Sequence, residues 1–255
     1  MNTVYQKINT IFMRDSKGKI MPESPLSQPE FEYLRNLKWR AEEKIDGTNI
    51  RLEVRSRIEY QVDIISNVEY FETDIPMGVH FDVKIAGKTD AAQIPPFLLK
   101  HLEETYPPEK VLESLGLEKF IHVKSWEEHG WKDISDIPEV YVIYGEGYGA
   151  KIQKGGGNYI KNGNGFIVFD VKVDNIWLTV SSRNSIAEKL GAPIVPLIGY
   201  FTIDEAVQFV KEGFKSKISE NPDYLAEGLV LRTDLGLLDR RGKRLITKIK
   251  YKDFK

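Results

Sequence analysis

The chain has 255 residues, a formal net charge of −2 and no cysteine. This length permits one large domain or two small ones, with enough residues to bury a core without disulfides. The lack of cysteine excludes disulfides, thiolate zinc sites and cysteine nucleophiles. The N-terminus has no basic segment followed by an apolar run, and no stretch approaches the ~18 apolar residues of a membrane-spanning helix. We therefore expect neither a signal peptide nor a transmembrane helix.

Apolar periodicity and the positions of proline and glycine predict an α+β chain of hairpins and scattered helices. Helices are expected at Pro96–Thr105, Pro108–Ser114, Ser182–Leu190 and Ile203–Lys211. Ser182 and Asp204 are expected to cap two of them. Strands are expected at Ala41–Lys44, Ile50–Arg55, Val79–Ala86, Val140–Gly145, Phe166–Lys172, Trp177–Val180, Gly228–Arg232 and Leu245–Tyr251. We find no linker, so we expect one domain with antiparallel sheets flanked by helices.

A run of chemically active residues extends from Glu43 to Arg51, with the sequence Glu-Lys-Ile-Asp-Gly-Thr-Asn-Ile-Arg. Side chains two apart on a strand share a face, so Lys44 and Asp46 are expected to point the same way. Gly47 permits a tight turn or a close backbone approach. A surface turn has the same composition. A nucleophilic lysine must be neutral, against an ordinary pKa of ~10.4. We therefore expect cations or a metal near Lys44 that hold its amine uncharged.

Two carboxylates occupy strand ends farther along the chain. Glu146 lies between glycines after the apolar strand at 140–145, and Glu227 precedes the strand at 228–232. Isolated acids of this kind commonly face solvent. Together with Asp46, however, they offer oxygen ligands to a divalent metal, largely through waters, as Mg²⁺ prefers.

The C-terminal segment is strongly basic. From Arg240 to Lys255 there are eight basic residues and one acid. The alternation over 245–251 predicts a strand with Lys248 and Lys250 on one face. Lysines near Lys44 would lower its pKa by like-charge repulsion and neutralise a triphosphate. Lysines also protect edge strands from aggregation, which is the alternative interpretation.

A glycine-rich segment separates two expected strands, with eight glycines between Gly145 and Gly165. It suits a surface that faces phosphates, or a disordered tip, and both interpretations stay open. On the strand that follows, Phe166 or Phe169 could stack on a base, a contact worth about 1–3 kcal/mol. Core packing is the alternative for either ring.

In this order the segments resemble the collinear motifs of the covalent nucleotidyltransferase superfamily, which comprises ATP-dependent ligases and RNA capping enzymes. Residues 44–49 resemble its motif I, 145–147 motif III, 166–171 motif IIIa, 227–231 motif IV and 248–250 motif V. Asn49, where DNA ligases carry arginine, is similar to the RNA ligase branch, particularly the phage and bacterial RNA ligase 2-like group. The resemblance covers roughly residues 5–255.

The resemblance implies an ATP-grasp-like ligase adenylation fold. It implies a nucleotidyltransferase domain, which we expect to cover residues 1–255. Because the chain stops five residues beyond Lys250, we expect no appended OB or C-terminal domain, which is a departure from the DNA ligases, capping enzymes and larger RNA ligases. The resemblance implies ATP and Mg²⁺ or Mn²⁺ as cofactors, and the joining of RNA 5′-phosphate and 3′-hydroxyl ends through lysyl-AMP and adenylated-RNA intermediates. The partners implied are RNA ends, nicked or single-stranded, in the cytoplasm of a bacterial or phage-infected cell. We expect a monomer.

The resemblance also implies roles for single residues. Lys44 is the nucleophile, and Asp46 and Asn49 are catalytic, Asn49 in the sealing steps. Glu146 would hold the ribose hydroxyls, while Asp46, Glu146 and Glu227 form the metal set. The residues expected to contact the nucleotide are Glu43, Ile45, Arg51, Lys88, Glu146, Phe166, Phe169, Glu227, Lys248 and Lys250. Lys88 takes the position of a family arginine, and Arg51 or Arg55 is expected to share its phosphate contact.

Three alternatives stay open. The chain could seal nicked DNA or RNA–DNA hybrids, although Asn49 counts against an enzyme for DNA alone. It could be a non-catalytic module that binds RNA ends on the same fold. It could also be a capping guanylyltransferase, which the expected lack of an appended domain disfavours.

Overall fold

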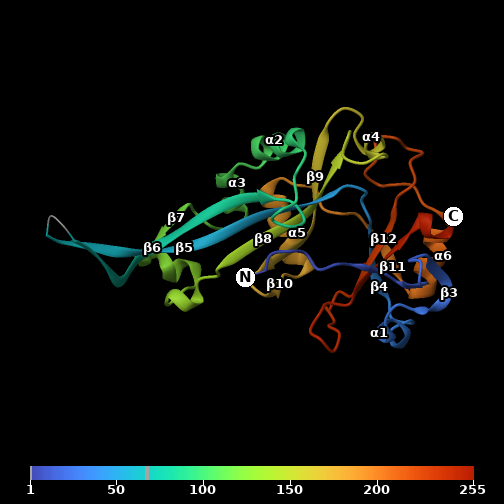
Figure 1. Cartoon of the computed structure of the whole chain (residues 1–255), viewed down its shortest axis with the longest axis horizontal. Coiled ribbons are helices and arrows are strands. Elements are labelled where there is room, and N and C mark those ends of the chain that lie inside the picture. Colours follow the sequence, from blue (N-terminus) through green and yellow to red (C-terminus); the bar gives the residue numbers. More distant parts are fainter. Residues whose placement is uncertain (1, 67–68) are drawn as a thin grey trace. The chain divides into compact units, whose positions relative to one another are not determined.

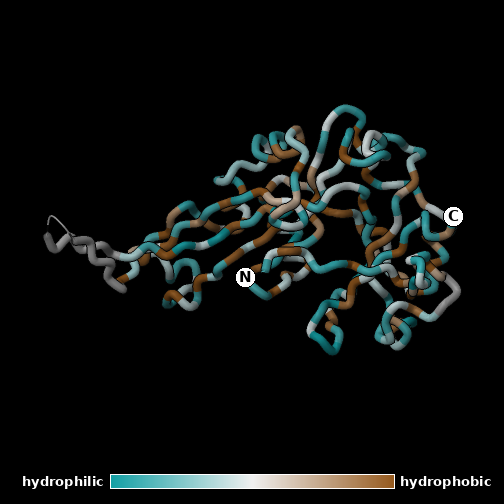
Figure 2. Tube along the Cα trace, in the orientation of Figure 1, coloured by the Kyte–Doolittle hydropathy of each residue, from teal (hydrophilic) through white to brown (hydrophobic). Residues whose placement is uncertain are grey.

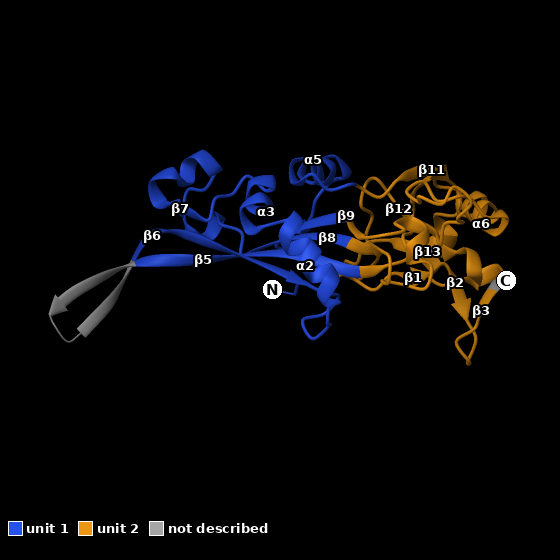
Figure 3. Ribbon diagram, turned by 90° about the horizontal axis from the view of Figure 1, so that it is seen from above, with its two compact units in different colours: residues 1–4, 49–145, 168–193 blue, residues 5–48, 146–167, 194–255 orange. Residues whose placement is uncertain are grey.

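The computed structural model describes residues 2–66 and 69–255, and their side chains except those at 22–24 and 61–74. The chain forms two compact units, each assembled from three segments (Figure 3). Unit 1 comprises residues 1–4, 49–145 and 168–193, and unit 2 comprises residues 5–48, 146–167 and 194–255. The single domain predicted over 1–255 includes residues 1 and 67–68, which lie outside the described residues, and it stays a prediction.

Unit 2 is built on a five-stranded sheet with the order β1-β13-β12-β4-β11 (Figure 1). Its strands are β1 (Asn9–Thr10), β4 (Trp39–Glu43), β11 (Leu197–Phe201), β12 (Gly228–Arg232) and β13 (Ile246–Lys250). A second, two-stranded sheet pairs β2 (Phe12–Arg14) with β3 (Ile20–Leu26). The helical elements of this unit are α1 (Pro29–Tyr33), α4 (Gly156–Tyr159), α6 (Ile203–Glu212) and the 3-10 turn η3 (Tyr251–Phe254).

The pairs β13–β12, β12–β4 and β4–β11 are antiparallel, as the sequence predicts. The edge pair is different, because β1 runs parallel to β13 with Asn9 beside Thr247 and Thr10 beside Lys248. Strand β1 was not predicted. It belongs to a chain segment far from β13 in sequence, so no tight hairpin turn imposes an antiparallel direction on this pair.

The core of unit 2 lies between its sheet and helix α6. Trp39 and Ala41 of β4 and Leu229 of β12 are fully buried, together with Ala206 and Val210 of α6. These helix residues are four apart and share one face. Figure 2 shows hydrophobic residues gathered along the strands and polar residues in the connecting loops. The packed face fixes the register of the strands that carry the candidate site.

Unit 1 contains most of a six-stranded sheet with the order β10-β9-β8-β5-β6-β7. Its strands are β5 (Thr48–Ser66), β6 (Glu69–Ala86), β7 (Phe120–His122), β8 (Val140–Gly149), β9 (Asn164–Val173) and β10 (Ile176–Trp177). Strands β8 and β9 have residues in both units. The helical elements are α2 (Pro96–Thr105), α3 (Pro108–Ser114), η1 (Val123–His129), η2 (Ile134–Asp136) and α5 (Val180–Leu190).

The sequence located most of these elements, and helices α2 and α3 have the predicted bounds. The strand predicted at Trp177–Val180 is wrong beyond Trp177, because Thr179 caps α5. The Thr179 hydroxyl accepts a hydrogen bond from the Ser182 N–H. Ser182 is therefore the capped residue and not the cap. At α6 the cap is Thr202, in a reciprocal box with Glu205, and not Asp204.

Strands β5 and β6 are 19 and 18 residues long, far beyond the predicted 50–55 and 79–86. The sequence from Arg57 to Ile64 alternates polar and apolar residues, which was the missed signal for the longer β5. Among the described residues, no helix is long and apolar enough to cross a membrane.

Candidate active site

The candidate site lies in unit 2, where strands β4, β12 and β13 lie side by side. Lys44 directly follows β4, and its backbone N–H donates to the Gly228 carbonyl oxygen at 2.9 Å. Gly228 is paired with Lys250 across the β12–β13 ladder. Gly228 has φ +151°, and a Cβ there would lie 2.0 Å from the Ile249 carbonyl oxygen. Glycine at 228 therefore allows the strand contact that brings Lys44 and Lys250 to the same row of the sheet.

Glu227 joins the two lysines. Its Oε2 accepts from Lys44 Nζ at 2.6 Å, and its Oε1 accepts from Lys250 Nζ at 2.5 Å. The three side chains are largely buried, with exposed fractions of 20% for each lysine and 12% for Glu227. Lys44 Nζ also donates to the Ile45 carbonyl oxygen at 3.2 Å. The structure thus assembles the predicted residues of motifs I, IV and V into one lysine–carboxylate–lysine triad.

The triad makes Lys44 a charged amine in this structure. Burial disfavours the ammonium, but the carboxylates of Glu227, Glu146 and Asp46 outweigh it and raise the Lys44 pKa above its ordinary value. For Glu227, burial is outweighed by the Lys44 and Lys250 ammoniums, which lower the pKa of the carboxyl. The prediction that surrounding cations hold Lys44 neutral is therefore wrong for the protein without ligands. Carboxylates are its dominant neighbours, and Lys250 is directed to Glu227.

Two further acids share this environment. Burial raises the pKa of Glu146 to about 7, opposed by the Lys44 ammonium and assisted by the charges of Glu227 and Asp46. Burial and the charge of Glu227 also raise the pKa of Asp46. In both groups burial is the largest cause, the neighbouring carboxylates add to the rise in pKa, and the lysine ammoniums oppose it. Such a group of acids gains stability from any cation that enters.

Gly47 brings the Lys44 segment against strand β8. A Cβ at Gly47 would lie 2.3 Å from the Gly147 carbonyl oxygen and 2.8 Å from Glu146 Cγ, so no larger residue fits without backbone movement. The glycine expected to permit a close approach thus makes one, and it sets the Lys44 segment beside Glu146.

Residues of the glycine-rich segment also position this run, and the sequence did not single them out. The Asp46 N–H donates to the hydroxyl of Tyr159 at 3.2 Å, and Gln153 Nε2 donates to the Gly47 carbonyl oxygen at 3.0 Å. Tyr159 is fully buried, and its ring packs edge-on against Tyr224 at 5.1 Å. A tyrosine within a glycine-rich stretch was the sequence signal that could have indicated this supporting role of Tyr159.

The predicted metal set is only partly assembled. Among the described residues, no group of three or more acidic or histidine side chains is arranged so that it could hold a metal ion. Glu227 uses both oxygens on lysines, whereas Asp46 and Glu146 share an electrostatic environment without such an ion pair. Metal binding by this set stays a prediction.

Two neighbours of Lys44 in the sequence are buried. Ile45 is 3% exposed, and Glu43 is 1% exposed. The Glu43 carboxylate accepts from the Ser216 hydroxyl at 2.5 Å and from the Lys217 N–H at 2.8 Å. These bonds occupy both oxygens and hold the segment after α6 against β4. The contact between Glu43 and adenine stays a prediction.

Arg51 has a structural role in unit 1. It is fully buried, and its guanidinium donates to the Gly87 carbonyl oxygen at 2.8 Å and to Asp90 Oδ1 at 2.6 Å. It also contacts Thr3 and Glu53. These bonds leave no exposed fork for a phosphate, so we remove Arg51 from the predicted nucleotide contacts. Lys88 is exposed on the turn that Arg51 holds.

The other predicted residues differ in exposure. Phe166 is 1% exposed, whereas Phe169 keeps part of its surface accessible. Phe166 is thus a core residue, and stacking on a base stays a prediction. Asn49, in β5, has a buried side-chain oxygen without a hydrogen-bond partner within the described residues. Lys248 is partly buried on β13, on the same face as Lys250, as the alternation predicts.

Solved structures of RNA ligases share this fold. A Naegleria gruberi RNA ligase variant without ligand matches with a TM-score of 0.50 and 16% identity, over 87% of this chain and 52% of that chain. Another variant of that ligase, with ATP and Mn, matches with a TM-score of 0.51 and 14% identity, over 97% of this chain and 63% of that chain. The chain thus spans about half to three-fifths of the length of these proteins. At such identities the likeness shows the fold alone.

The chain belongs to the RNA ligase family, whose family model matches residues 37–251. This confirms the resemblance to RNA ligases on which the residue roles were based, and the phage and bacterial subgroup stays a prediction. The matched range contains the whole Lys44–Glu227–Lys250 triad. No curated protein matches the sequence.

The triad predicts how Lys44 titrates. Without ligands its amine should lose its proton above the ordinary lysine range, and Glu227→Gln should move that pKa down because the largest attraction on the ammonium is gone. Competitive labelling with acetic anhydride across pH, followed by mass spectrometry of the Lys44 peptide, measures it. Glu212→Gln, at an exposed acid that ends α6, is the matched control and should change nothing. An ordinary or lowered pKa in the unsubstituted protein would contradict the assignment.

The structural role of Arg51 predicts a stability effect. Arg51→Met should lower the free energy of unfolding by about 3 kcal/mol, because the Gly87 carbonyl oxygen loses its guanidinium donor and buried Glu53 keeps only Arg55 of its two arginine partners. Urea unfolding measures this change. Lys88→Met, at an exposed position on the same turn, should leave the unfolding midpoint in place. Equal urea midpoints for the two variants would contradict the structural role of Arg51 and leave a nucleotide contact as its predicted role.

Proposed function

We propose that this protein is an ATP-dependent RNA ligase that joins a 5′-phosphate to a 3′-hydroxyl through a lysyl-AMP intermediate. The observation that carries the proposal is the Lys44–Glu227–Lys250 triad, formed by residues of three separate motifs in a chain of the RNA ligase family. A partly buried lysine fixed by a carboxylate at 2.6 Å is a positioned amine, and positioning is a large part of nucleophilic catalysis.

In the first step, the Lys44 Nζ lone pair attacks the α-phosphorus of ATP. A P–N bond forms, the P–O bond to pyrophosphate breaks, and one amine proton leaves to solvent. Lys250, which already lies beside Glu227, would hold phosphate oxygens as their charge develops. In the later steps AMP passes to the RNA 5′-phosphate, and the 3′-hydroxyl then displaces AMP.

Lys44 must lose its proton before it attacks, yet Glu227, Glu146 and Asp46 stabilise the proton. A divalent cation fits this group of acids, because Asp46 and Glu146 have raised pKa values and lack lysine partners of the kind that Glu227 has. Mg²⁺ is typically held by one or two carboxylates together with waters and substrate phosphates. Asp46 and Glu146 would hold the ion, and its charge would offset the field that raises the Lys44 pKa.

Glu146 would also orient the nucleotide. Its carboxyl has a pKa of about 7 and accepts from the Gly47 backbone, so near neutral pH it exists in both protonation states. Either form can hydrogen-bond a ribose hydroxyl, as acceptor or as donor. Glu146 is therefore proposed both as a metal ligand and as the ribose contact, in keeping with its position beside the Lys44 segment.

Lys44 is the first residue to test. Incubation with ATP labelled at the α-phosphate should leave AMP on the protein through a bond that acid cleaves and alkali does not, as expected for a phosphoramidate. Lys44→Ala should abolish the label, whereas Lys215→Ala, an exposed lysine of the same unit, should retain it. GTP and NAD run in parallel test the nucleotide. Label that persists in Lys44→Ala would overturn the proposal.

Asn49 should act after adenylylation. Its buried, unpartnered side-chain oxygen would accept a hydrogen bond from a substrate hydroxyl, and an unsatisfied buried acceptor costs about 1–3 kcal/mol. Asn49→Ala should form lysyl-AMP at a rate within about threefold of the unsubstituted protein, but should seal adenylated RNA at least tenfold more slowly. Asn49→Asp keeps an acceptor and should retain more sealing. Equal loss in adenylylation and sealing would contradict this role.

A further inference from the structure

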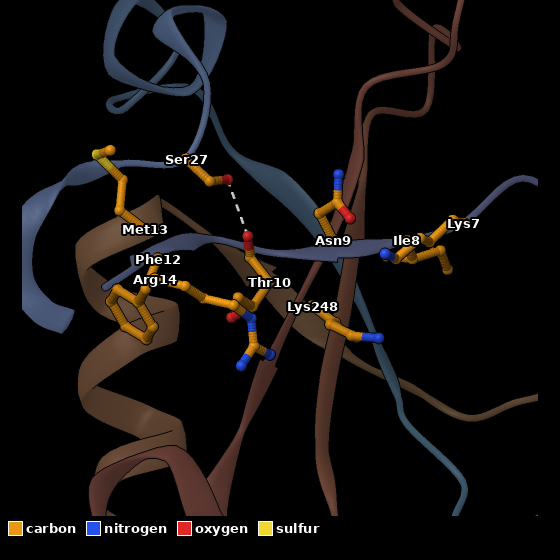
Figure 4. A pocket seen from close by; sticks show the side chains of 9 residues that line it. All are labelled: Lys7, Ile8, Asn9, Thr10, Phe12, Met13, Arg14, Ser27 and Lys248. Atoms are coloured by element: carbon orange, nitrogen blue, oxygen red, sulfur yellow. Dashed lines mark hydrogen bonds between the residues drawn. The ribbon is translucent and has the colours of Figure 1, made fainter. Parts of the chain in front are cut away.

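A pocket lies in unit 2 at the parallel edge of the five-stranded sheet. It is a cavity of about 440 Å³ beside strands β1 and β2 (Figure 4). Its lining includes Lys7, Thr10 and Arg14 from the N-terminal segment, Ser27 from the end of β3, and Lys248 from β13. Among these residues only Lys248 belongs to the motifs used above, so the N-terminal segment supplies most of the pocket.

The pocket is cationic. Three of its nine lining residues are Lys7, Arg14 and Lys248, and none of the nine is acidic. One guanidinium N–H of Arg14 donates to the Gly18 carbonyl oxygen at 2.6 Å, which fixes the side chain within the β2–β3 hairpin. The guanidinium has further N–H groups that can donate to a ligand. In Figure 4 the Arg14 and Lys248 side chains lie on the same side of β1, and Asn9 lies on the opposite side. The Arg14 guanidinium lowers the pKa of the Asp253 carboxyl, against a larger rise from burial, but Asp253 does not line the cavity.

A buried hydroxyl in the same lining has no partner. Thr10 is 5% exposed, and its Oγ1 makes no hydrogen bond within the described residues. Its backbone carbonyl oxygen is used, because the Ser27 hydroxyl donates to it at 2.8 Å. A buried hydroxyl without a partner is costly, and here it is a donor in a lining with three cations and no acid. This combination favours an anion with several oxygens.

We propose that this pocket binds a substrate phosphate, separate from the α-phosphate at Lys44. A guanidinium, two ammoniums and a hydroxyl match the oxygens of a phosphate. Lys248 and Lys250 are two residues apart on one strand face, about 7 Å along the strand. The pocket thus begins two residues along β13 from Lys250 of the triad. The inference rests on the proposed function, and the phosphate belongs either to the triphosphate of ATP or to the RNA strand.

The test removes the two exposed cations that belong to the pocket alone, in the double variant Lys7→Ala/Arg14→Ala. The matched control is Lys17→Ala/Lys19→Ala, which removes two exposed charges from the β2–β3 hairpin outside the pocket. Lys17 and Lys19 bond Asp15 through backbone groups, so truncation of their side chains spares these contacts. Thermal unfolding confirms that both variants are folded. Calorimetry measures pyrophosphate and ATP binding, and fluorescence anisotropy measures binding of a 5′-phosphorylated 12-nucleotide RNA across salt concentrations.

The two phosphate sources give different results. If the pocket holds the triphosphate, the pocket variant binds pyrophosphate and ATP about tenfold more weakly than the control, with equal RNA affinity. If it holds the RNA strand, RNA binding weakens about tenfold and its salt dependence falls by about 0.7 per lost phosphate contact, with equal ATP affinity. If both variants bind all three probes with equal affinity, the proposal that this pocket binds a substrate phosphate is overturned. Absence of lysyl-AMP in the unsubstituted protein overturns the ligase proposal instead. The pyrophosphate and RNA measurements then still decide whether the pocket binds a phosphate.

Discussion

The hydrogen-bonded triad of Lys44, Glu227 and Lys250 is the interaction on which the candidate site depends. One carboxylate between two ammoniums, at 2.6 and 2.5 Å, fixes the position of the amine and satisfies the charges in a partly buried space. The arrangement requires the register of β4, β12 and β13, which the packed core beneath these strands sets. A slip of one residue in β13 would turn Lys250 to the other face and leave Glu227 with one partner.

The same carboxylates that position Lys44 also hold its proton. In the protein without ligands this costs reactivity, because the raised pKa keeps the amine protonated near neutral pH. The same field would make the reactivity of Lys44 depend on bound cations. Bound cations would neutralise Asp46 and Glu146 and weaken the field on the ammonium, so the amine would become a nucleophile mainly when metal and nucleotide are present. In the proposed mechanism, a resting charged lysine and a reactive neutral lysine would thus be two states of one site.

The sequence predicted much of the fold where the pattern is local. Helices α2 and α3 have their predicted bounds, and strand β12 does as well. Predictions failed where a distant contact decides. Strand β1 pairs in parallel with β13, and Arg51 is buried by partners at Gly87 and Asp90. The predicted cap Ser182 lies three residues after the actual cap Thr179, and the predicted cap Asp204 lies two residues after Thr202, because several hydroxyl and acidic residues near each helix start compete for that position.

By itself, the sequence determined the chemical inventory and its order: a lysine with a carboxylate two residues on, two strand-end acids and a pair of lysines on one strand face. Motif order and alternation suffice for this, since they are properties of the chain. Only the tertiary structure decided the charge of Lys44, because a pKa depends on which groups lie within a few ångströms and how deeply they are buried. It also decided that Tyr159 supports Asp46 and that Lys7, Thr10 and Arg14 gather around Lys248. Those neighbours are far apart in the sequence, and only the packed sheet brings them together.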